Sequence, residues 1–267
     1  MKIAFIGGGN MGEAMIRGIL NKGLARAEDI VVSDISQKRR SHLSKDYRVA
    51  TESDNRQAVN QADSVVLAVK PVSLPDAAKE LKGSLRPEQV VISIIAGISL
   101  SGLYDVLDHR TVVRAMPNMP AQIGEGVTVW TATDDVEESQ RGKASNILAA
   151  LGKEIFVPDE KYVDMATAVS GSGPAYVFLI IESFIDAAVH IGLPRELAQE
   201  LVLETVLGST HLVQKSTNHP AELRNLVTSP GGTTAEGLLQ LEEGGLRALL
   251  AQAIIAGYEK AKALRGE

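Results

Sequence analysis

The sequence predicts an α/β Rossmann-type N-terminal domain, built on a mostly parallel doubly wound sheet, followed by an all-helical C-terminal domain. Short apolar runs alternate with amphipathic stretches through the first half of the chain, and no convincing strand pattern follows Pro158. Alternation of this kind is typical of βαβ units, whereas continuous helical periodicity indicates a helical domain. We therefore expect domains at residues 1–158 and 159–267.

Each expected strand of the first domain is short and rich in β-branched residues. The strands are expected at residues 3–6, 30–32, 64–69, 89–95, 111–115, 126–130 and 154–157. Helical patterns lie between them, at residues 10–22, 37–44, 55–61, 74–83, 99–107 and 136–151. Apolar strands that alternate with helices form parallel sheets covered on both faces.

The second domain shows only helical patterns, at residues 162–169, 176–191, 194–214, 220–227, 234–242 and 246–264. Pro174, Pro194 and Pro220 stand at or near the first turn of three of these helices, where proline is favoured. The helix at 176–191 is apolar nearly all round, so it must be buried on most sides. A second subunit would bury it, and a central place in one domain core is the alternative.

Composition excludes several kinds of site and partner. The 267 residues contain no cysteine, which excludes disulfides, thiolate nucleophiles and zinc–thiolate centres. A formal net charge of −6 is poorly suited to binding nucleic acid. The five histidines show no metal-ligand spacing, and no apolar run approaches the ~18 residues of a membrane span. We expect a soluble, cytoplasmic protein without metal, nucleic-acid or membrane partners.

A glycine-rich motif directly follows the first expected strand. Its residues are Gly7, Gly8, Gly9, Asn10, Met11 and Gly12, which give G-x-G-x-x-G at the start of a helical pattern. The first glycine permits a tight turn, the second lets the backbone approach a pyrophosphate, and the third allows close helix–strand packing. This strand–turn–helix context predicts a dinucleotide site, although a structural glycine turn is the alternative.

The second expected strand is followed by Asp34, 22 residues after Gly12. An acid there can bind the ribose hydroxyls of NAD and would repel the 2′-phosphate of NADP. However, Lys38, Arg39 and Arg40 follow closely and could contact such a phosphate. A helix cap is a further alternative for Asp34. The choice between NADH and NADPH stays open, with a lean to NAD from Asp34.

Two further strands are expected to end at the same edge of the sheet, where ligands bind in doubly wound folds. The residues at these ends are Ala68, Val69, Lys70 and Pro71 on one strand, and Ala96 on the other. They would form walls for the nicotinamide half of the cofactor. A solvated loop lysine is the alternative for Lys70.

Two glycine-rich segments in the helical half combine hydroxyl groups, backbone N–H groups and an expected helix start. They are residues 170–176 (SGSGPAY) and residues 229–234 (SPGGTT). Such a combination can bind a carboxylate without a basic side chain. Each segment could also be a plain helix cap with its preceding turn. Beside a dinucleotide motif, the pair suggests a small anionic substrate.

Together these segments resemble pyrroline-5-carboxylate reductase across essentially the whole chain. The matching stretches are residues 5–12 (FIGGGNMG), 68–71 (AVKP), 114–118 (RAMPN), 170–176 and 229–234. The resemblance implies reduction of 1-pyrroline-5-carboxylate to L-proline with NADPH or NADH. It also implies a helical domain that binds substrate and forms a homodimer, with dimers that can assemble into a decamer.

The resemblance also implies roles for individual residues. Cofactor contacts would come from Ile6, Gly7, Gly8, Gly9, Asn10, Met11, Gly12, Asp34, Asn55, Ala68, Val69, Lys70, Pro71 and Ala96. The substrate carboxylate would lie on the loop of Ser229, Gly231, Gly232 and Thr233, with Glu160 also on the substrate side. The Thr234 hydroxyl would be the catalytic group, bound to the ring nitrogen. Asp34 differs from the small or basic residues of NADPH-preferring members, which puts the cofactor preference in question.

A protonated imine accepts hydride readily, so positioning should dominate catalysis. We expect Thr234 to orient the nitrogen or relay a proton to it, since no strong general acid stands out. A β-hydroxyacid dehydrogenase would need a lysine on the helix after residues 170–173, but none occurs before Lys215. A non-enzymatic cofactor sensor is the other alternative, but it would not need the anion loop at 229–234.

Overall fold

The computed structural model describes residues 1–265, which form two compact units. The first contains residues 1–172 and 257–265, and the second contains Gly173–Ala256. The division therefore falls later than residue 158. Helix α7 (Lys161–Ala166) packs on the last strands of the sheet, and the end of α12 (Leu246–Arg265) also belongs to the first unit.

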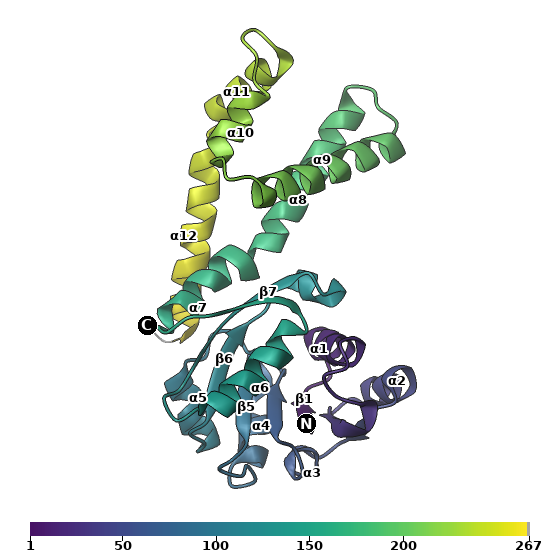
Figure 1. The fold of residues 1–267 in the computed structure, drawn as a ribbon, viewed down its shortest axis with the longest axis vertical. Helices are drawn as coiled ribbons and strands as arrows, with labels where there is room; N and C mark the ends of the chain where they lie inside the picture. Colours follow the sequence, from purple (N-terminus) through teal and green to yellow (C-terminus); the bar gives the residue numbers. More distant parts are fainter. Residues whose placement is uncertain (266–267) are drawn as a thin grey trace. The chain divides into compact units, whose positions relative to one another are not determined.

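The first unit is built on one eight-stranded sheet in the order β3-β2-β1-β4-β5-β6-β7-β8 (Figure 1). Every neighbouring pair is parallel except β6 and β7, which are antiparallel. The strands are β1 (Ile3–Ile6), β2 (Ile30–Ser33), β3 (Ala50–Glu52), β4 (Ser64–Leu67), β5 (Val90–Ser93), β6 (Val112–Met116), β7 (Gly126–Ala132) and β8 (Gly152–Phe156). This confirms the predicted mostly parallel, doubly wound sheet.

One strand, β3, was missing from the sequence prediction. It is only three residues long, reads Ala-Thr-Glu, and pairs on one side alone, with β2. A short edge strand needs no apolar run because one of its edges and part of its surface face solvent. The other seven strands lie where the sequence predicts them, with ends shifted by a few residues.

Helices cover both faces of this sheet, as alternating strand residues require. They are α1 (Asn10–Asn21), α2 (Gln37–Tyr47), α3 (Asn55–Val59), α4 (Leu74–Leu81), α5 (Leu100–Leu107), α6 (Glu138–Ala149) and α7, with short turns η1 (Ala27–Asp29), η2 (Pro71–Ser73), η3 (Met119–Ile123) and η4 (Thr167–Gly171). Ile3 and Phe5 pack in one apolar core with α1 and α6. Ala4 and Ile6 pack in a second core with α3, α4 and α5.

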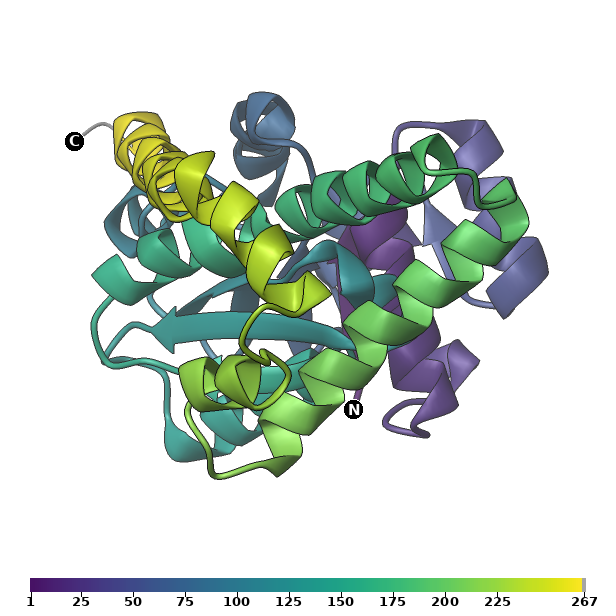
Figure 2. The same ribbon diagram turned by 90° about the horizontal axis from the view of Figure 1, so that it is seen from above.

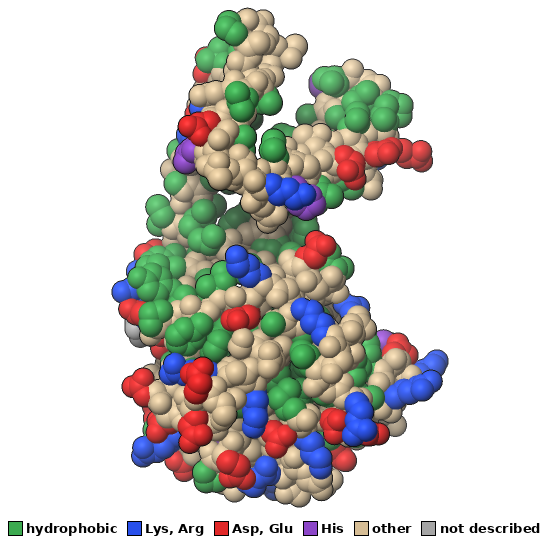
Figure 3. Space-filling model, in the orientation of Figure 1, with side chains coloured by type: hydrophobic (Ala, Val, Ile, Leu, Met, Phe, Trp, Pro, Cys, Tyr) green, Lys and Arg blue, Asp and Glu red, His purple; other side chains and the backbone are tan. Residues whose placement is uncertain are grey.

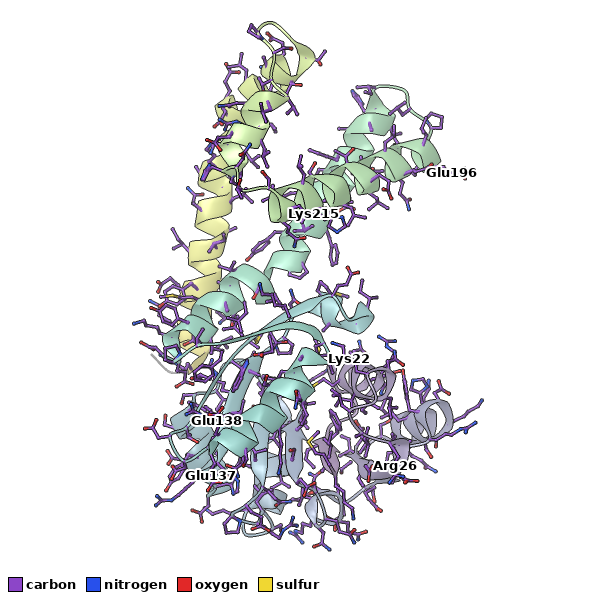
Figure 4. The ribbon with its side chains drawn as sticks, in the orientation of Figure 1. Lys22, Arg26, Glu137, Glu138, Glu196 and Lys215 are labelled. Carbon is purple, nitrogen blue, oxygen red and sulfur yellow. The ribbon has the colours of Figure 1, made fainter. Side chains whose placement is uncertain are left out.

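The second unit is entirely helical in its described residues. Its helices are α8 (Gly173–His190), α9 (Arg195–Lys215), α10 (Pro220–Leu226), α11 (Thr233–Glu243) and most of α12. Helices α8 and α9 lie side by side as a hairpin (Figures 1 and 2). Glu196 lies in the first turn of α9 and Lys215 in its last turn (Figure 4), so both charges complement the helix dipole.

The helices of this unit leave much apolar surface uncovered. Ala198 and Val202 are the only buried residues between 173 and 256. Phe178 and Leu179 on the apolar helix α8 are 51% and 62% exposed. Hydrophobic side chains are visible on the surface of these helices in Figure 3. A monomer would rarely expose so large an apolar area, so this unit needs a partner surface.

One helical stretch, Lys161–His190, has the length and composition to cross a membrane, contrary to the sequence-based expectation. Its best 18-residue window has a mean hydropathy of 1.4, and 6% of it is buried. Length and composition alone do not distinguish a membrane span from an apolar helix that a second subunit covers. The feature is therefore weak evidence for a membrane span.

Candidate cofactor site and anion-binding loop

The glycine motif forms the turn between β1 and α1, as predicted. Gly7 adopts a left-handed φ of 99°, and a Cβ there would lie 2.8 Å from the Ala68 carbonyl group. Gly9 caps α1 without a side chain, and the first helical hydrogen bond runs from Glu13 N–H to Gly9 O. Among residues 1–265 the N–H groups of residues 9–12 find no partner, so the turn offers free donors to an anion.

Gly12 allows the helix to pack closely against the turn. A Cβ at this position would lie 2.6 Å from the Gly7 carbonyl oxygen, closer than side chains tolerate. We expect Gly12→Ala to push the turn away from its position and weaken NADH binding about tenfold, or 1.4 kcal/mol, in a fluorescence titration. Gly142→Ala on α6 is the control, because a Cβ there meets nothing within 4 Å. Unchanged affinity in Gly12→Ala would show that the close packing is not needed.

Asp34 and Asn55 lie beside this turn, at the ends of β2 and β3. The Asp34 carboxylate accepts hydrogen bonds from Gly8 N–H at 2.9 Å and from Ser36 N–H at 2.8 Å. The Asn55 side-chain oxygen accepts from the buried Ser33 hydroxyl at 2.7 Å, which leaves its amide nitrogen to donate. Asp34 therefore stabilises the glycine turn. Its carboxylate still has lone pairs that can accept hydrogen bonds from ribose hydroxyls.

The remaining predicted cofactor residues follow β4 and β5 at the same edge of the sheet. Ala68 and Val69 are half-buried, Lys70 is exposed, and Pro71 begins the short η2 turn. Ala96 is half-buried in the segment between β5 and α5. The fold thus gathers all fourteen predicted cofactor residues at the carboxyl ends of four adjacent strands, β2-β1-β4-β5, and at the start of α3. Free N–H donors with a carboxylate and an amide fit a dinucleotide.

Glu160 takes part in a cluster of four charged side chains, two of which are buried. Its Oε1 accepts from Leu100 N–H at 2.8 Å and from Arg114 Nη1 at 2.6 Å. Arg114 also donates to Asp164 Oδ1 at 2.5 Å, and Asp164 Oδ2 lies 3.0 Å from Arg265 Nη1. Arg114 and Asp164 are each 3% exposed. These contacts engage Oε1 of the carboxylate expected to bind substrate and link it to the start of α5.

Residues 170–176 do not form the open helix start that the sequence predicted. The turn η4 (Thr167–Gly171) has π-helical hydrogen bonding and continues α7 directly towards α8. Ser172 N–H donates to Thr167 O, and the Ser170 hydroxyl donates to Ala166 O at 2.9 Å. Because these groups are used inside the helical run, the segment is not an anion-binding N-terminus.

Residues 229–234 do form an open loop at the start of α11. Gly231 is left-handed with φ 69°, and Gly232 caps α11 without any side-chain hydrogen bond. The loop is closed by Gly232 N–H to Ser229 O at 3.1 Å. In the described part of the chain the N–H groups of Gly231, Thr233 and Thr234 have no partner. The loop can therefore donate to a carboxylate, as predicted from its sequence.

The sequence analysis missed Glu13 and the partner role of Arg39. Glu13 on α1 contacts Arg39, His42 and Tyr47 on α2, next to the glycine turn. The sequence does contain a signal for this contact. An acidic residue directly follows the G-x-G-x-x-G motif, and basic residues lie on the next helix. The described residues contain no cluster that could hold a metal ion.

Two family models match the chain. Residues 160–264 match the pyrroline-5-carboxylate reductase dimerisation family, and residues 2–97 match the family of NADP oxidoreductases that are coenzyme F420-dependent. The first match begins two residues after the predicted domain boundary at 158.

Full-length relatives agree with these matches. A pyrroline-5-carboxylate reductase of Synechocystis is 41% identical over 265 residues, covering 99% of this chain and 98% of its own. The solved pyrroline-5-carboxylate reductase of Coxiella burnetii is 37% identical, with a TM-score of 0.90 and coverage of 99% and 98%. That of Plasmodium falciparum, solved with NADP bound, is 34% identical, with a TM-score of 0.91 and the same coverage.

Proposed function

The chain belongs to the pyrroline-5-carboxylate reductase family, and we infer that it reduces 1-pyrroline-5-carboxylate to L-proline with NADH or NADPH, the final step of proline biosynthesis. The observation that carries this inference is similarity to named reductases over nearly the whole chain, at up to 41% identity among those compared. Fold alone would not suffice, because Rossmann-type domains serve many reactions.

For the cofactor we propose the contacts expected from the sequence. In the turn at Gly7 to Gly12, the free N–H groups of residues 9–12 would hold the pyrophosphate against the start of α1. Asp34 and Asn55 would bind the adenosine ribose, and Ala68, Val69, Lys70, Pro71 and Ala96 would border the nicotinamide. When bound, the nicotinamide supplies the hydride.

For the substrate we propose the loop at the start of α11. Gly231 and Thr233 would donate their free N–H groups to the carboxylate, while Gly232, whose N–H binds Ser229 O, would hold the loop closed around it. The Thr234 hydroxyl would hold the ring nitrogen in its protonated form or relay a proton to it. For Glu160 we propose a place on the substrate side of the site, with its Oε1 held by Leu100 N–H and Arg114.

Isotope transfer tests the reaction itself. With NADH carrying deuterium at the transferred position of C4, proline should gain one deuterium, at the carbon that was the imine carbon. Mass spectrometry of the product, with unlabelled NADH as control, makes the measurement. Unlabelled proline, or cofactor oxidation without proline, would contradict the proposed reaction.

We also propose that the chain forms homodimers through the second unit, that dimers can assemble into a decamer, and that the protein is cytoplasmic. The support for the dimer is the match to a dimerisation family at residues 160–264 and the uncovered apolar side chains of α8. Burial against a second copy would cover these side chains.

Assembly can be tested with one charge on α8. Leu179→Glu should shift the protein from an oligomer towards the 28.4 kDa monomer in sedimentation equilibrium, because it places a carboxylate in an apolar interface. Val72→Glu is the control, since Val72 is 81% exposed in the first unit. An unchanged mass for Leu179→Glu would place the interface elsewhere.

A further inference from the structure

A network of polar side chains joins α1 to α2 next to the glycine turn. None of its residues has a role in the proposed reaction. Glu13, on the first helical turns after the glycine motif, pairs with Arg39 through its Oε2. Its Oε1 lies 2.9 Å from His42 Nε2 and accepts from the Tyr47 hydroxyl at 2.8 Å. The Arg39 and Glu13 side chains are 24% and 19% exposed, so the pair is largely shielded from solvent.

Arg39 is held at two points. Its Nη2 binds Glu13, and its Nε donates to the Gly8 carbonyl oxygen, on the same glycine whose N–H binds Asp34. Arg39 lies three residues after Ser36, which caps α2. An arginine in this region of a Rossmann domain is well placed to take a 2′-phosphate. Here the guanidinium of Arg39 instead binds the Gly8 carbonyl oxygen and the Glu13 carboxylate.

Glu13 is ionised at neutral pH. Burial raises the pKa of Glu13, but hydrogen bonds from His42, Arg39 and Tyr47 outweigh it and lower the pKa to about 2. The negative charge of Glu13 therefore offsets the positive charge of Arg39. Asp34 adds a negative charge at the proposed ribose site, and Arg40 donates to the main-chain oxygen of Asp34 at 2.6 Å.

We propose that Glu13 is a specificity-determining residue, which favours NADH by holding Arg39 in a neutral ion pair and so withholding it from a 2′-phosphate. The proposal rests on the proposed function in naming NADH and NADPH as the competing cofactors. A freed arginine would bind a phosphate with two parallel hydrogen bonds, which is the geometry that guanidinium groups favour.

The test compares Glu13→Ala with wild type. The ratio of kcat/KM for NADPH to that for NADH should rise about tenfold, through a lower KM for NADPH. Binding of 2′,5′-ADP relative to 5′-AMP, measured by calorimetry, should rise by a similar factor. This second readout needs no turnover, so it still tests the role of Glu13 if the imine is not reduced.

Two controls identify the group responsible. The double variant Glu13→Ala with Arg39→Gln should lose the increased preference for NADPH, because no freed guanidinium remains. Tyr47→Phe removes one hydrogen bond to Glu13 but keeps the ion pair, so its ratio should stay within about twofold of wild type. Should Glu13→Ala fail to fold, Glu13→Gln removes the charge and keeps the side-chain length and one of the two acceptor oxygens.

Either of two results would overturn the proposal. One is a folded Glu13 variant in which both the NADPH-to-NADH ratio of kcat/KM and the 2′,5′-ADP-to-5′-AMP ratio of affinity stay within twofold of wild type. The other is a gain that persists in the double variant, because Arg39 would then not carry it.

Discussion

Thr234→Ala should lower kcat for imine reduction about 100-fold or more, the range expected when a group that positions or transfers a proton is lost. Thr234 lies in the first turn of α11, half-buried behind the open loop at Gly231 and Gly232. Removing its hydroxyl leaves the loop N–H groups in place, so the KM for the substrate should change much less than kcat. Steady-state rates across pH make the measurement.

Thr234→Ser is the matched control, because it keeps the hydroxyl and removes only a methyl group. We expect it to keep kcat within about fivefold of wild type, since the hydrogen-bonding group remains. If Thr234→Ala keeps the wild-type kcat and KM at every pH, Thr234 is not the catalytic group. That result would not contradict the proposed reaction.

Arg114→Met should lower the free energy of unfolding by about 3–5 kcal/mol, because it leaves the buried carboxylate of Asp164 without one of its charged partners. Arg114 joins β6 to both Glu160 and Asp164, and it is 3% exposed. Urea unfolding at one fixed protein concentration measures the change, since an oligomer's stability depends on concentration.

The control for this prediction is Arg26→Met. Arg26 pairs with Glu28 at 2.8 Å, but the two side chains are 78% and 67% exposed, so the loss should stay within about 1 kcal/mol. Arg26 lies on the first unit, as Figure 4 shows, so both variants test the same unit. An Arg114→Met protein as stable as Arg26→Met would mean that solvent reaches the cluster.

The elements with strong local patterns were predictable from the sequence. Apolar runs such as Ile3–Ile6 and the glycine motif that follows define a strand and a turn without reference to distant residues. The loop at residues 229–234 was also predictable, because left-handed Gly231 and the uncapped Gly232 follow from local glycine chemistry.

Features that depend on distant partners were not predictable. Glu160 binds Arg114, 46 residues away in sequence, so no local pattern shows this contact. Residues 170–176 have the composition of a helix start. However, Thr167 and Ser170 hydroxyls bond to carbonyl oxygens four residues back, and the helical run continues through them. Arg39 contacts Glu13 across two helices, which the sequence motif cannot show.

The most direct test of the proposed function is loss of absorbance at 340 nm with purified protein and 1-pyrroline-5-carboxylate, run in parallel with NADH and NADPH. We predict saturable turnover that forms proline, with a higher kcat/KM for NADH because Asp34 and the Glu13–Arg39 pair border the ribose. No turnover with either cofactor, from folded protein that still binds NADH, would contradict the assignment as a pyrroline-5-carboxylate reductase.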